Sequence, residues 1–567
     1  LGEGYSRGEV TLAFDIKASG VKKMRLAMRG DKQPDLGQDV YASVLDSVSA
    51  RLAMVAGAAN GQKCTVADIS TAFVHARLTG AKIFLRCGEE FGEDKKGKIA
   101  VLNSALYGLR ESSKLWQDHM ATVMRSVGFT RSAGDENLWM RTEKQLVNGR
   151  KVRELVGIYV DDLLCISTDG EAIIAQLERC LKIKFASTPD VYLGGELRYD
   201  KTGLLTMTAS GYITEMVAQL EQGGKRMGLR DLPMRNDDHP EFLVGEEDED
   251  LNKMDTRFFQ RLVGQVLWVG GGLGRIDVSF AAASLSRFAT NPKQGHLTRA
   301  LECIEYLNKH KDLGILIDPS DPQELPEADH NARILLKGAG LPEVRTEAEI
   351  REALAGGLSG EDHLQREIAF NEAVGHVREM EKDMRDWEEE MDENDPVPMG
   401  KPLKITAFVD ANWAHDYKTR KSITGIIIYV GSTPVYWKST RQSSISSSTF
   451  EAEMAGLRTV AEVNRAIRIG MRSHGMPING ATKVMCDNMS AILQATKHDA
   501  VLKKRHTAIS WFRVREAVKR NEMDVCFVPS EWQLADILTK PVGGIIFNRL
   551  IAMIMHRVIT TVETTRA

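Results

Sequence analysis

The spacing of apolar and polar positions divides the chain into regions of different secondary structure. Residues 155–167, LVGIYVDDLLCIS, hold two β-branched apolar runs separated by Asp161 and Asp162, which predicts a hairpin with both aspartates at its turn. From Lys404, the stretches ITAFVDANW, SITGIIIYV and PVYWKST predict a three-stranded meander. Between these regions, apolar residues recur at three- and four-residue steps over 361–391 and predict one amphipathic helix. The pattern favours an α+β protein, and no apolar run approaches the roughly 18 residues that span a bilayer, so we expect no membrane partner.

Charge is distributed unevenly along the 567 residues, a length that predicts three to four domains. The net charge is −4, yet residues 318–400 hold 23 acidic and 8 basic residues, and 66 basic and 55 acidic residues remain outside them. A second acidic run, 237–250, holds eight carboxylates and no Lys or Arg. A basic body suits a polyanionic partner, although a solvated Lys/Arg surface gives the same count. The segment 318–342, rich in Pro, Asp and Glu, is typical of a linker.

The seven cysteines are scattered, without a CxxC pair or a Cys/His cluster at zinc spacing. This favours a reduced, intracellular compartment. The first residue is Leu1, so we expect the chain to be part of a longer translation product.

The paired aspartates indicate a metal site. Turn residues are the alternative interpretation, since Asp suits a turn. However, adjacent carboxylates between apolar strands repel each other and lose hydration, a cost that bound cations would offset. Asp68, in CTVADISTAF at the end of a predicted strand, is a third candidate ligand.

The order of six motifs carries a family resemblance: DISTAF (68–73), FLRCGEEF (84–91), ALYGLRESSKLW (105–116), GFTRSAGDENLW (128–139), YVDD (159–162) and YLGGEL (192–197). Together they resemble the reverse transcriptase of copia-type LTR retrotransposons. The resemblance implies a right-hand polymerase with fingers, palm and thumb. It also implies that Asp68, Asp161 and Asp162 hold two Mg²⁺ ions, with Mn²⁺ as the alternative ion, for transfer of a nucleotide to a primer 3′-OH.

The same resemblance implies a set of substrate-binding residues. Phe73 falls at the position that excludes a 2′-OH from the incoming nucleotide, with core packing as the alternative. Tyr107, Gly108 and Arg110 match the motif that lies against nucleotide and template, although the family's usual Gln-Ala-Pro is replaced by Glu-Ser-Ser at 111–113. Two further candidates, in a basic strand that would contact the triphosphate, are Arg25 and Arg29.

A second group of acids follows the linker. In SSTFEAEM, Glu451 is expected to turn back to the cap of a helix, which leaves Glu453 to face a site. The series FVDANWA, TRKSITG, SSTFEAEM, CDNMSAI and ADILTK resembles the RNase H domain of copia-type elements. That resemblance implies a second two-metal site formed by Asp410, Glu453, Asp487 and Asp536, with water as nucleophile and an RNA–DNA hybrid as substrate. Asp536 is expected on a helix capped by Ser530 and Gln533.

The two resemblances imply a right-hand polymerase followed by an RNase H-like mixed α/β domain. We expect fingers and palm at 1–208, a helical thumb or connection region at 209–317, an acidic linker and helical insert at 318–403, the RNase H-like domain at 404–543 and a tail at 544–567. The implied function is RNA- and DNA-directed DNA synthesis with RNase H activity. Implied partners are RNA template, DNA primer, RNA–DNA hybrid, deoxynucleoside triphosphates and other parts of a Pol polyprotein, in a cytoplasmic virus-like particle with access to the nucleus. A degenerate or domesticated copy that only binds nucleic acid, and an interaction protein built around the acidic helix, are the alternatives.

Overall fold

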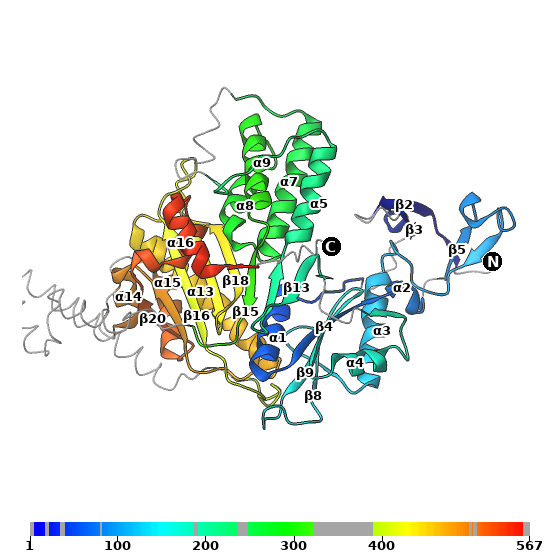
Figure 1. Cartoon of the computed structure of the whole chain (residues 1–567), viewed down its shortest axis with the longest axis horizontal. Coiled ribbons are helices and arrows are strands. Elements are labelled where there is room, and N and C mark those ends of the chain that lie inside the picture. Colours follow the sequence, from blue (N-terminus) through cyan, green and yellow to red (C-terminus); the bar gives the residue numbers. More distant parts are fainter. Residues whose placement is uncertain are drawn as a thin grey trace, which may run out of the picture. The chain divides into compact units, whose positions relative to one another are not determined.

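The computed structural model describes residues 5–16, 22–33, 40–79, 82–185, 191–234, 248–322, 389, 391–497, 500, 502 and 507–558 (Figure 1). The chain forms two compact units. Unit 1 contains residues 1–224, 396–401 and 470–477, and unit 2 contains 225–395, 402–469 and 478–567. The predicted helix over 361–391 lies outside the described residues except for Glu389 and Met391, and most of the acidic run 237–250 also lies outside them.

A six-stranded sheet is the centre of unit 1. Its order is β11 (Ile183–Phe185), β4 (Lys63–Ile69), β10 (Asp162–Ser167), β9 (Arg153–Tyr159), β8 (Leu138–Thr142) and β7 (Thr130–Arg131). Every neighbouring pair is antiparallel. The predicted hairpin over 155–167 is confirmed as β9 and β10.

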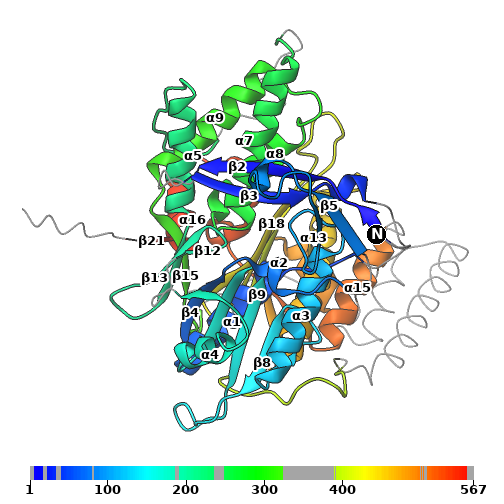
Figure 2. The same cartoon turned by 90° about the vertical axis from the view of Figure 1, so that its right-hand side faces the viewer.

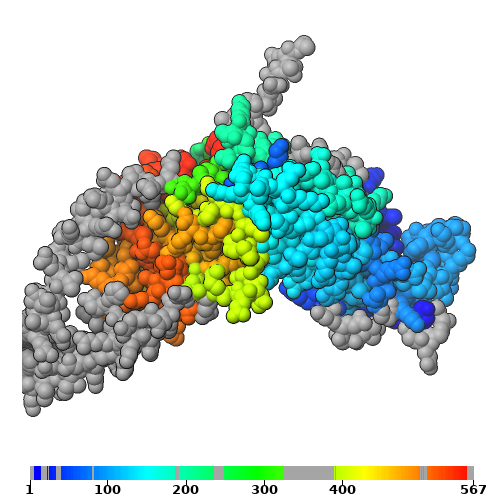
Figure 3. Space-filling model, turned by 90° about the horizontal axis from the view of Figure 1, so that it is seen from below, coloured from blue at the N-terminus to red at the C-terminus, as the bar shows by residue number. Residues whose placement is uncertain are grey.

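Helices lie against both faces of this sheet, which explains why its central strands are continuous apolar runs. Leu163 and Cys165 share a core with α3 (Ser112–Ser126) and α4 (Gly170–Leu177). Residues one position along point to the opposite face, where Ile166 meets Gly57 of α1 (Ser47–Asn60). Figure 2 shows α3 beside strands β8 and β9, and in Figure 3 the cyan part of unit 1 forms a continuous surface on the face in view.

Smaller elements complete unit 1. A three-stranded sheet has the order β1 (Tyr5–Arg7), β5 (Lys82–Arg86) and β6 (Ile99–Val101), and β2 (Val10–Ile16) pairs with β3 (Lys22–Met28). The remaining elements include the 3-10 helices η1 (Gly30–Lys32) and η2 (Glu89–Phe91), α2 (Ala72–His75), β12 (Val191–Tyr192), β13 (Gly195–Tyr199), β14 (Leu205–Thr208) and α5 (Ser210–Gln222). Strands β12, β13 and β14 pair antiparallel in that order.

Two later segments of the chain belong to unit 1. The Ser132 hydroxyl lies 2.9 Å from the Ser473 carbonyl oxygen and 2.7 Å from His474 Nδ1, and all three residues are buried. Arg153 donates to the Val397 carbonyl at 2.8 Å. Unit 1 is therefore discontinuous in sequence.

A five-stranded sheet is the centre of unit 2. Its order is β18 (Thr433–Arg441), β17 (Ile423–Val430), β16 (Ile405–Asn412), β19 (Thr482–Cys486) and β20 (Met523–Phe527). Strands β16, β17 and β18 are antiparallel, which confirms the predicted meander, whereas β19 and β20 run parallel to β16. The associated helices are α13 (Thr449–Ser473), whose last residues belong to unit 1, α14 (Met489–Thr496) and α15 (Ala508–Lys519).

The other elements of unit 2 come mainly from the region expected to form a thumb or connection. They are α7 (Lys253–Gly271), the 3-10 helix η3 (Ile276–Val278), α8 (Ser279–Ser286), α9 (Gln294–Lys309), β15 (Leu313–Ile317), the 3-10 helices η5 (Ser530–Trp532) and η6 (Leu534–Leu538), α16 (Gly544–Ile554) and β21 (His556–Arg557). Strand β15 pairs with β21. The Trp437 indole of β18 donates to the Gly270 carbonyl of α7 at 2.8 Å, so this region packs on the five-stranded sheet within one unit.

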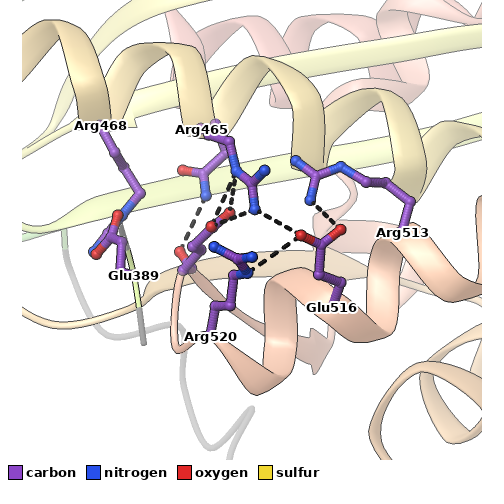
Figure 4. A network of polar contacts seen from close by, with 8 residues as sticks. Glu389, Arg465, Arg468, Arg513, Glu516 and Arg520 are labelled. Atoms are coloured by element: carbon purple, nitrogen blue, oxygen red, sulfur yellow. Dashed lines mark hydrogen bonds and ion pairs between the residues drawn. The ribbon is translucent and has the colours of Figure 1, made fainter. Parts of the chain in front are cut away.

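An ionic network joins α13 to α15 and to the turn before β20 (Figure 4). Arg465 reaches Glu522 at 2.6 Å and Glu516 at 3.2 Å, and Arg520 also reaches Glu516 at 3.2 Å. Arg468 donates from Nε and from Nη2 to the two carboxylate oxygens of Glu389, each at 2.6 Å. No helix in the described part of the chain is long and apolar enough to cross a membrane.

Candidate catalytic sites

The hairpin of unit 1 holds its two aspartates in different settings. The two-residue turn consists of Val160 and Asp161, whereas Asp162 is the first residue of β10 and pairs with Tyr159. The prediction that both aspartates lie at the turn is confirmed: Asp161 lies in the loop, and Asp162 is the last residue of the four-residue turn 159–162 and the first of the strand. Val160 has φ +57°, a left-handed conformation that is unfavourable for a β-branched residue.

The three predicted carboxylates of unit 1 come from neighbouring strands. Asp162 of β10 lies directly opposite Asp68 of β4 in the register, and the Asp161 carbonyl accepts a hydrogen bond of 2.7 Å from the Ile69 amide. Burial raises the pKa of Asp162 to about 6, with further contributions from the charges of Asp161 and Asp68. The three acids are thus close enough to repel one another. A cation between them would relieve that repulsion.

The carboxylates of unit 1 are more widely spaced than those of unit 2. In the described residues, the one group of three potential metal-ligand side chains with all ligand atoms within 4.8 Å of one another is Asp410, Glu453 and Asp487. Asp68 is exposed, and Asp161 and Asp162 are half-buried. The unit 1 side chains would therefore have to move closer together to share an ion.

Two of the predicted substrate-binding residues contact each other beside these acids. The rings of Phe73 and Tyr107 pack edge to face with centroids 4.8 Å apart. Burial raises the pKa of the Tyr107 hydroxyl, as do the charges of Asp161 and Asp68, whereas the charge of Arg25 lowers it. Tyr107 is therefore close enough to the acids and to Arg25 to be affected by their charges, and Phe73 packs against it.

Gly108 has a backbone role. Its φ is +84°, and a Cβ there would lie 2.2 Å from the Met28 carbonyl oxygen of β3. A Cβ on Gly30 would in turn lie 2.2 Å from the Gly108 carbonyl oxygen, and the Met28 amide donates to the Tyr107 carbonyl at 2.6 Å. These glycines allow two backbone segments to meet closely. That contact fixes Tyr107 against the strand that carries Arg25.

Arg29 and Arg110 both form contacts with other residues of unit 1. Arg29 forms an exposed ion pair with Asp31 at 2.6 Å. The Arg110 amide donates to the Gln33 side chain at 3.1 Å. Gln33 also donates to Glu111 at 2.7 Å, and the other Glu111 carboxylate oxygen is buried and has no hydrogen-bond partner in the part of the chain that the structure describes. The contact between Gln33 and Glu111 could not be predicted, because these two residues are 78 positions apart in the chain.

In unit 2, three acids from three elements form one cluster. Asp410 lies in β16, Glu453 in the first turns of α13, and Asp487 directly after β19. Glu453 is 5% exposed; one of its carboxylate oxygens accepts from the Ala411 amide at 3.3 Å, and the other is buried with no hydrogen-bond partner among the described residues. Burial raises the pKa of Glu453 to about 9, followed by the charges of Asp410 and Asp487. Burial and the charge of Asp410 also raise the pKa of Asp487.

Glu451 faces away from this cluster, as expected. Its carboxylate accepts from the amide and the hydroxyl of Ser447, each at 2.6 Å, and its own amide donates to Ser448 at 3.4 Å. The carboxylate of Glu451 therefore forms its hydrogen bonds at the start of the helix. Glu453, two residues later, is on a different side of the helix.

Asp536 lies beside the cluster, but not on an α-helix. The prediction of a helix capped by Ser530 and Gln533 is confirmed for Gln533, whose side chain accepts from the Ala535 amide at 3.3 Å at the start of the 3-10 helix η6, whereas Ser530 begins the separate 3-10 helix η5. The buried Gln533 side chain donates to the Val409 carbonyl of β16 at 2.9 Å, which fixes this segment against the strand of Asp410. Burial raises the pKa of Asp536 to about 7, with a further contribution from Asp410.

Two residues that the sequence reasoning missed complete this site. The Thr539 hydroxyl donates to the Asp410 carboxylate. Lys540 lies 2.9 Å from Asp536, and its charge lowers the pKa of Glu453, Asp487 and Asp536. Their positions three and four residues after Asp536 place them on the same side of a helical turn, which was the available signal.

The donor set fits a hard divalent cation. All ligands are carboxylate oxygens, the type that Mg²⁺ prefers. The partnerless buried oxygen of Glu453 and the raised pKa values indicate an arrangement whose mutual repulsion a cation would offset. Asp410, Glu453 and Asp487, with Asp536 beside them, would hold such an ion.

Comparison with known proteins identifies the first part of the chain. Residues 11–227 match the family model described as reverse transcriptase (RNA-dependent DNA polymerase). The retrovirus-related Pol polyprotein from transposon RE1 of Arabidopsis thaliana is 21% identical over 94% of this chain and 30% of its own length. The putative transposon Ty5-1 protein YCL074W of Saccharomyces cerevisiae is 25% identical over 42% of this chain and 74% of its own length. The chain spans about a third of the length of the Pol polyproteins RE1 and RE2.

Similar solved structures include viral and bacterial proteins. The foamy viral protease-reverse transcriptase in complex with double-stranded DNA has a TM-score of 0.39 and 12% identity, covering 92% of this chain and 65% of that chain. An N-terminal RNase H domain from Mycobacterium tuberculosis, solved as a fusion protein, has a TM-score of 0.20 and 13% identity, covering 26% of this chain and 97% of that chain. Over most of its length the chain is thus similar to retrotransposon Pol polyproteins, and its residues 11–227 match the reverse transcriptase family model.

Proposed function

We propose that this chain copies RNA into DNA in unit 1 and cleaves the RNA strand of the resulting hybrid in unit 2. The observation that carries the proposal is the register that sets Asp162 opposite Asp68 on adjacent strands, with Asp161 at the neighbouring turn. The carboxylate cluster of unit 2 supports the second activity.

In unit 1, the side chains supply binding and orientation. Asp68, Asp161 and Asp162 would hold two divalent ions, which would supply activation of the primer 3′-OH and neutralisation of the phosphates. Phe73 packs against Tyr107 and forms the floor on which we place the sugar of the incoming deoxynucleotide. Arg25, whose charge reaches Tyr107, is the basic side chain that we assign to the triphosphate.

In unit 2, the same chemistry takes water as the nucleophile. Asp410, Glu453, Asp487 and Asp536 would hold the ions, which would supply a hydroxide at neutral pH and stabilise the leaving oxygen. Thr539 orients the Asp410 carboxylate, and Lys540 orients that of Asp536. Burial lowers the pKa of Lys540, but the charges of Asp410 and Asp536 raise it further, so that the net shift is upward. Lys540 therefore stays positively charged and reduces the repulsion among the carboxylates of the cluster.

The two activities are tested separately by substituting one carboxylate at a time. Asp162→Asn removes a charge from unit 1, so we expect primer extension on an RNA template with Mg²⁺ to fall at least about a hundredfold while hybrid cleavage stays within about twofold. Asp169→Asn is the matched control, because Asp169 caps α4 at an exposed position and asparagine is an equally good cap. Extension that survives in Asp162→Asn would contradict the polymerase site.

The second site is tested with two glutamates of one helix. Glu453→Gln and Asp487→Asn should abolish cleavage of the RNA strand and leave extension intact. Glu451→Gln, at the cap of α13, should retain cleavage. Equal loss in Glu451→Gln and Glu453→Gln would mean that folding, and not the cluster, determines the activity.

Nucleic-acid binding without catalysis is the second candidate. The observation that favours it is Glu111, which replaces the usual residue of the family motif and has a buried carboxylate oxygen without a partner beside the predicted nucleotide contacts. A chain that binds an RNA–DNA hybrid but shows neither extension nor cleavage with Mg²⁺ or Mn²⁺ would support this candidate and overturn the first.

A further inference from the structure

The turn between β9 and β10 adopts a conformation that its sequence does not favour. Val160 has φ +57°, and left-handed backbone is uncommon for a β-branched side chain. Such conformations persist where the surrounding structure holds them in place. The turn connects Tyr159 to Asp162, so whatever restrains Val160 also sets the direction of the two aspartates that follow it.

One side chain makes a directed contact with this turn from a helix. Trp116 of α3 is 3% exposed, and its indole Nε1 donates a hydrogen bond of 2.7 Å to the Val160 carbonyl oxygen. A left-handed residue turns its carbonyl away from the regular ladder of the sheet, so that oxygen needs a partner elsewhere. Trp116 supplies the partner from 44 positions earlier in the chain.

The indole is itself fixed by its neighbours. Its ring stacks on His119 of the same helix, with centroids 5.8 Å apart and planes at 30°, and lies 6.3 Å from the ring of His75 in α2. The short helix α2 also carries Phe73. Trp116 therefore connects the helix of Phe73 to the turn of the aspartates.

Open space borders the turn on one side. A cavity of about 70 Å³ is lined by Val160, Trp116, Phe73 and Trp139, among other residues. Open volume next to Val160 leaves the turn room to relax, since a void provides no contact atoms on that side. The hydrogen bond from Trp116 is thus the directional restraint on the cavity side of the turn.

We propose that Trp116 is a positioning residue of the polymerase site, which holds the Val160 carbonyl so that Asp161 and Asp162 keep their orientation relative to Asp68. The inference rests on the proposed function of unit 1. The indole touches neither substrate nor metal. Its effect passes through the backbone of the turn.

The test removes the indole N–H and keeps an aromatic ring. Trp116→Phe should lower kcat for single-nucleotide extension roughly tenfold, leave the KM for the nucleotide within about twofold, and leave hybrid cleavage unchanged, because misorientation of reacting groups affects the chemical step more than binding. Trp139→Phe is the matched control. Trp139 is buried and lines the same cavity, and no hydrogen bond joins its indole to the turn in the described residues. Equal losses in both variants would overturn the proposal.

A second background separates positioning from general packing. Glycine adopts left-handed backbone without steric cost, so in a Val160→Gly background the loss caused by Trp116→Phe should shrink to less than about threefold. An undiminished loss in that background would mean that Trp116 does not act through the turn.

Amide hydrogen exchange gives a readout that needs no catalysis. Trp116→Phe should accelerate exchange in peptides covering 159–163 and leave the rest of unit 1 unchanged, whereas a structural defect would accelerate exchange throughout the unit. If the unmutated chain fails to extend a primer, the proposed function fails, and the exchange pattern still decides the role of Trp116. Unchanged exchange at 159–163 would overturn the proposal.

Discussion

At the scale of single residues, the structure separates acids that look alike in the sequence. Glu451 and Glu453 are two positions apart, yet one is bound by Ser447 at the cap and the other joins the cluster of Asp410 and Asp487. This difference could be predicted, because a capping pattern assigns the first glutamate to the helix start. Both aspartates could be placed at the turn, but the division between Asp161 in the loop and Asp162 in the strand depends on the pairing register and could not be predicted.

Glu453→Gln should stabilise unit 2 in metal-free buffer. The folded pKa of Glu453 is about 9, above the value of about 4.5 for a free side chain, so stability is fully present below pH 4.5 and is lost as the pH rises towards 9. Glutamine mimics the protonated acid. At pH 7 the free energy of unfolding of Glu453→Gln should therefore exceed that of the unmutated chain by up to about 3 kcal/mol.

The measurement is urea unfolding between pH 5 and 9 with a chelator present. The unmutated chain should become less stable across this range, and Glu453→Gln should show a flatter profile. Glu451→Gln serves as the control and should keep the slope while losing stability at the cap. An identical slope in all three proteins would exclude Glu453 as its origin.

At the scale of elements, the hairpin of unit 1 and the meander of unit 2 follow from alternation and turn residues alone. The 3-10 segment around Asp536 does not. Its local pattern resembles a helix, but Gln533 bonds to Val409, 124 residues earlier, and this long-range contact sets the backbone. The contact between Trp116 and Val160 could not be predicted from the sequence either, because the residue types do not indicate which residues they contact.

The ionic network on α13 gives a prediction about stability. Arg465→Leu leaves the carboxylate of Glu522, which is 2% exposed, without its ion pair, so we expect a loss of about 2 to 3 kcal/mol. Arg458→Leu on the same helix removes an exposed pair with Glu462 and should cost less than about 0.5 kcal/mol. Urea midpoints at pH 7 compare the two. Equal midpoints would contradict a structural role for the network.

At the scale of the whole molecule, the two units do not coincide with continuous stretches of sequence. Residues 470–477 follow most of α13, yet they belong to unit 1, where Ser132 meets Ser473 and His474. The five segments expected from the sequence were continuous, because periodicity and composition are read along the chain and cannot show that a later turn packs on an earlier strand.

A fragment of residues 1–401 should therefore make a less durable polymerase than the full chain. It lacks 470–477, which leaves the buried hydroxyl of Ser132 without its contacts to Ser473 and His474 and exposes apolar surface. The comparison is with full-length Asp487→Asn, which keeps this segment and lacks cleavage. We expect the fragment to lose extension activity several-fold faster at 40 °C than the full chain. Equal half-lives would show that unit 1 does not need the segment.

The discontinuity of unit 1 also limits how such coding sequences can recombine. A crossover between two related coding sequences near codon 404 would join residues 1–403 of one parent to the remaining residues of the other, and would thereby supply a foreign 470–477 to the pocket of Ser132 and Gly134. A Cβ at Gly134 would lie 2.3 Å from the Ser473 hydroxyl, so this pocket accepts few alternatives. Viable hybrids should consequently inherit residues 132–134 and 473–474 from the same parent.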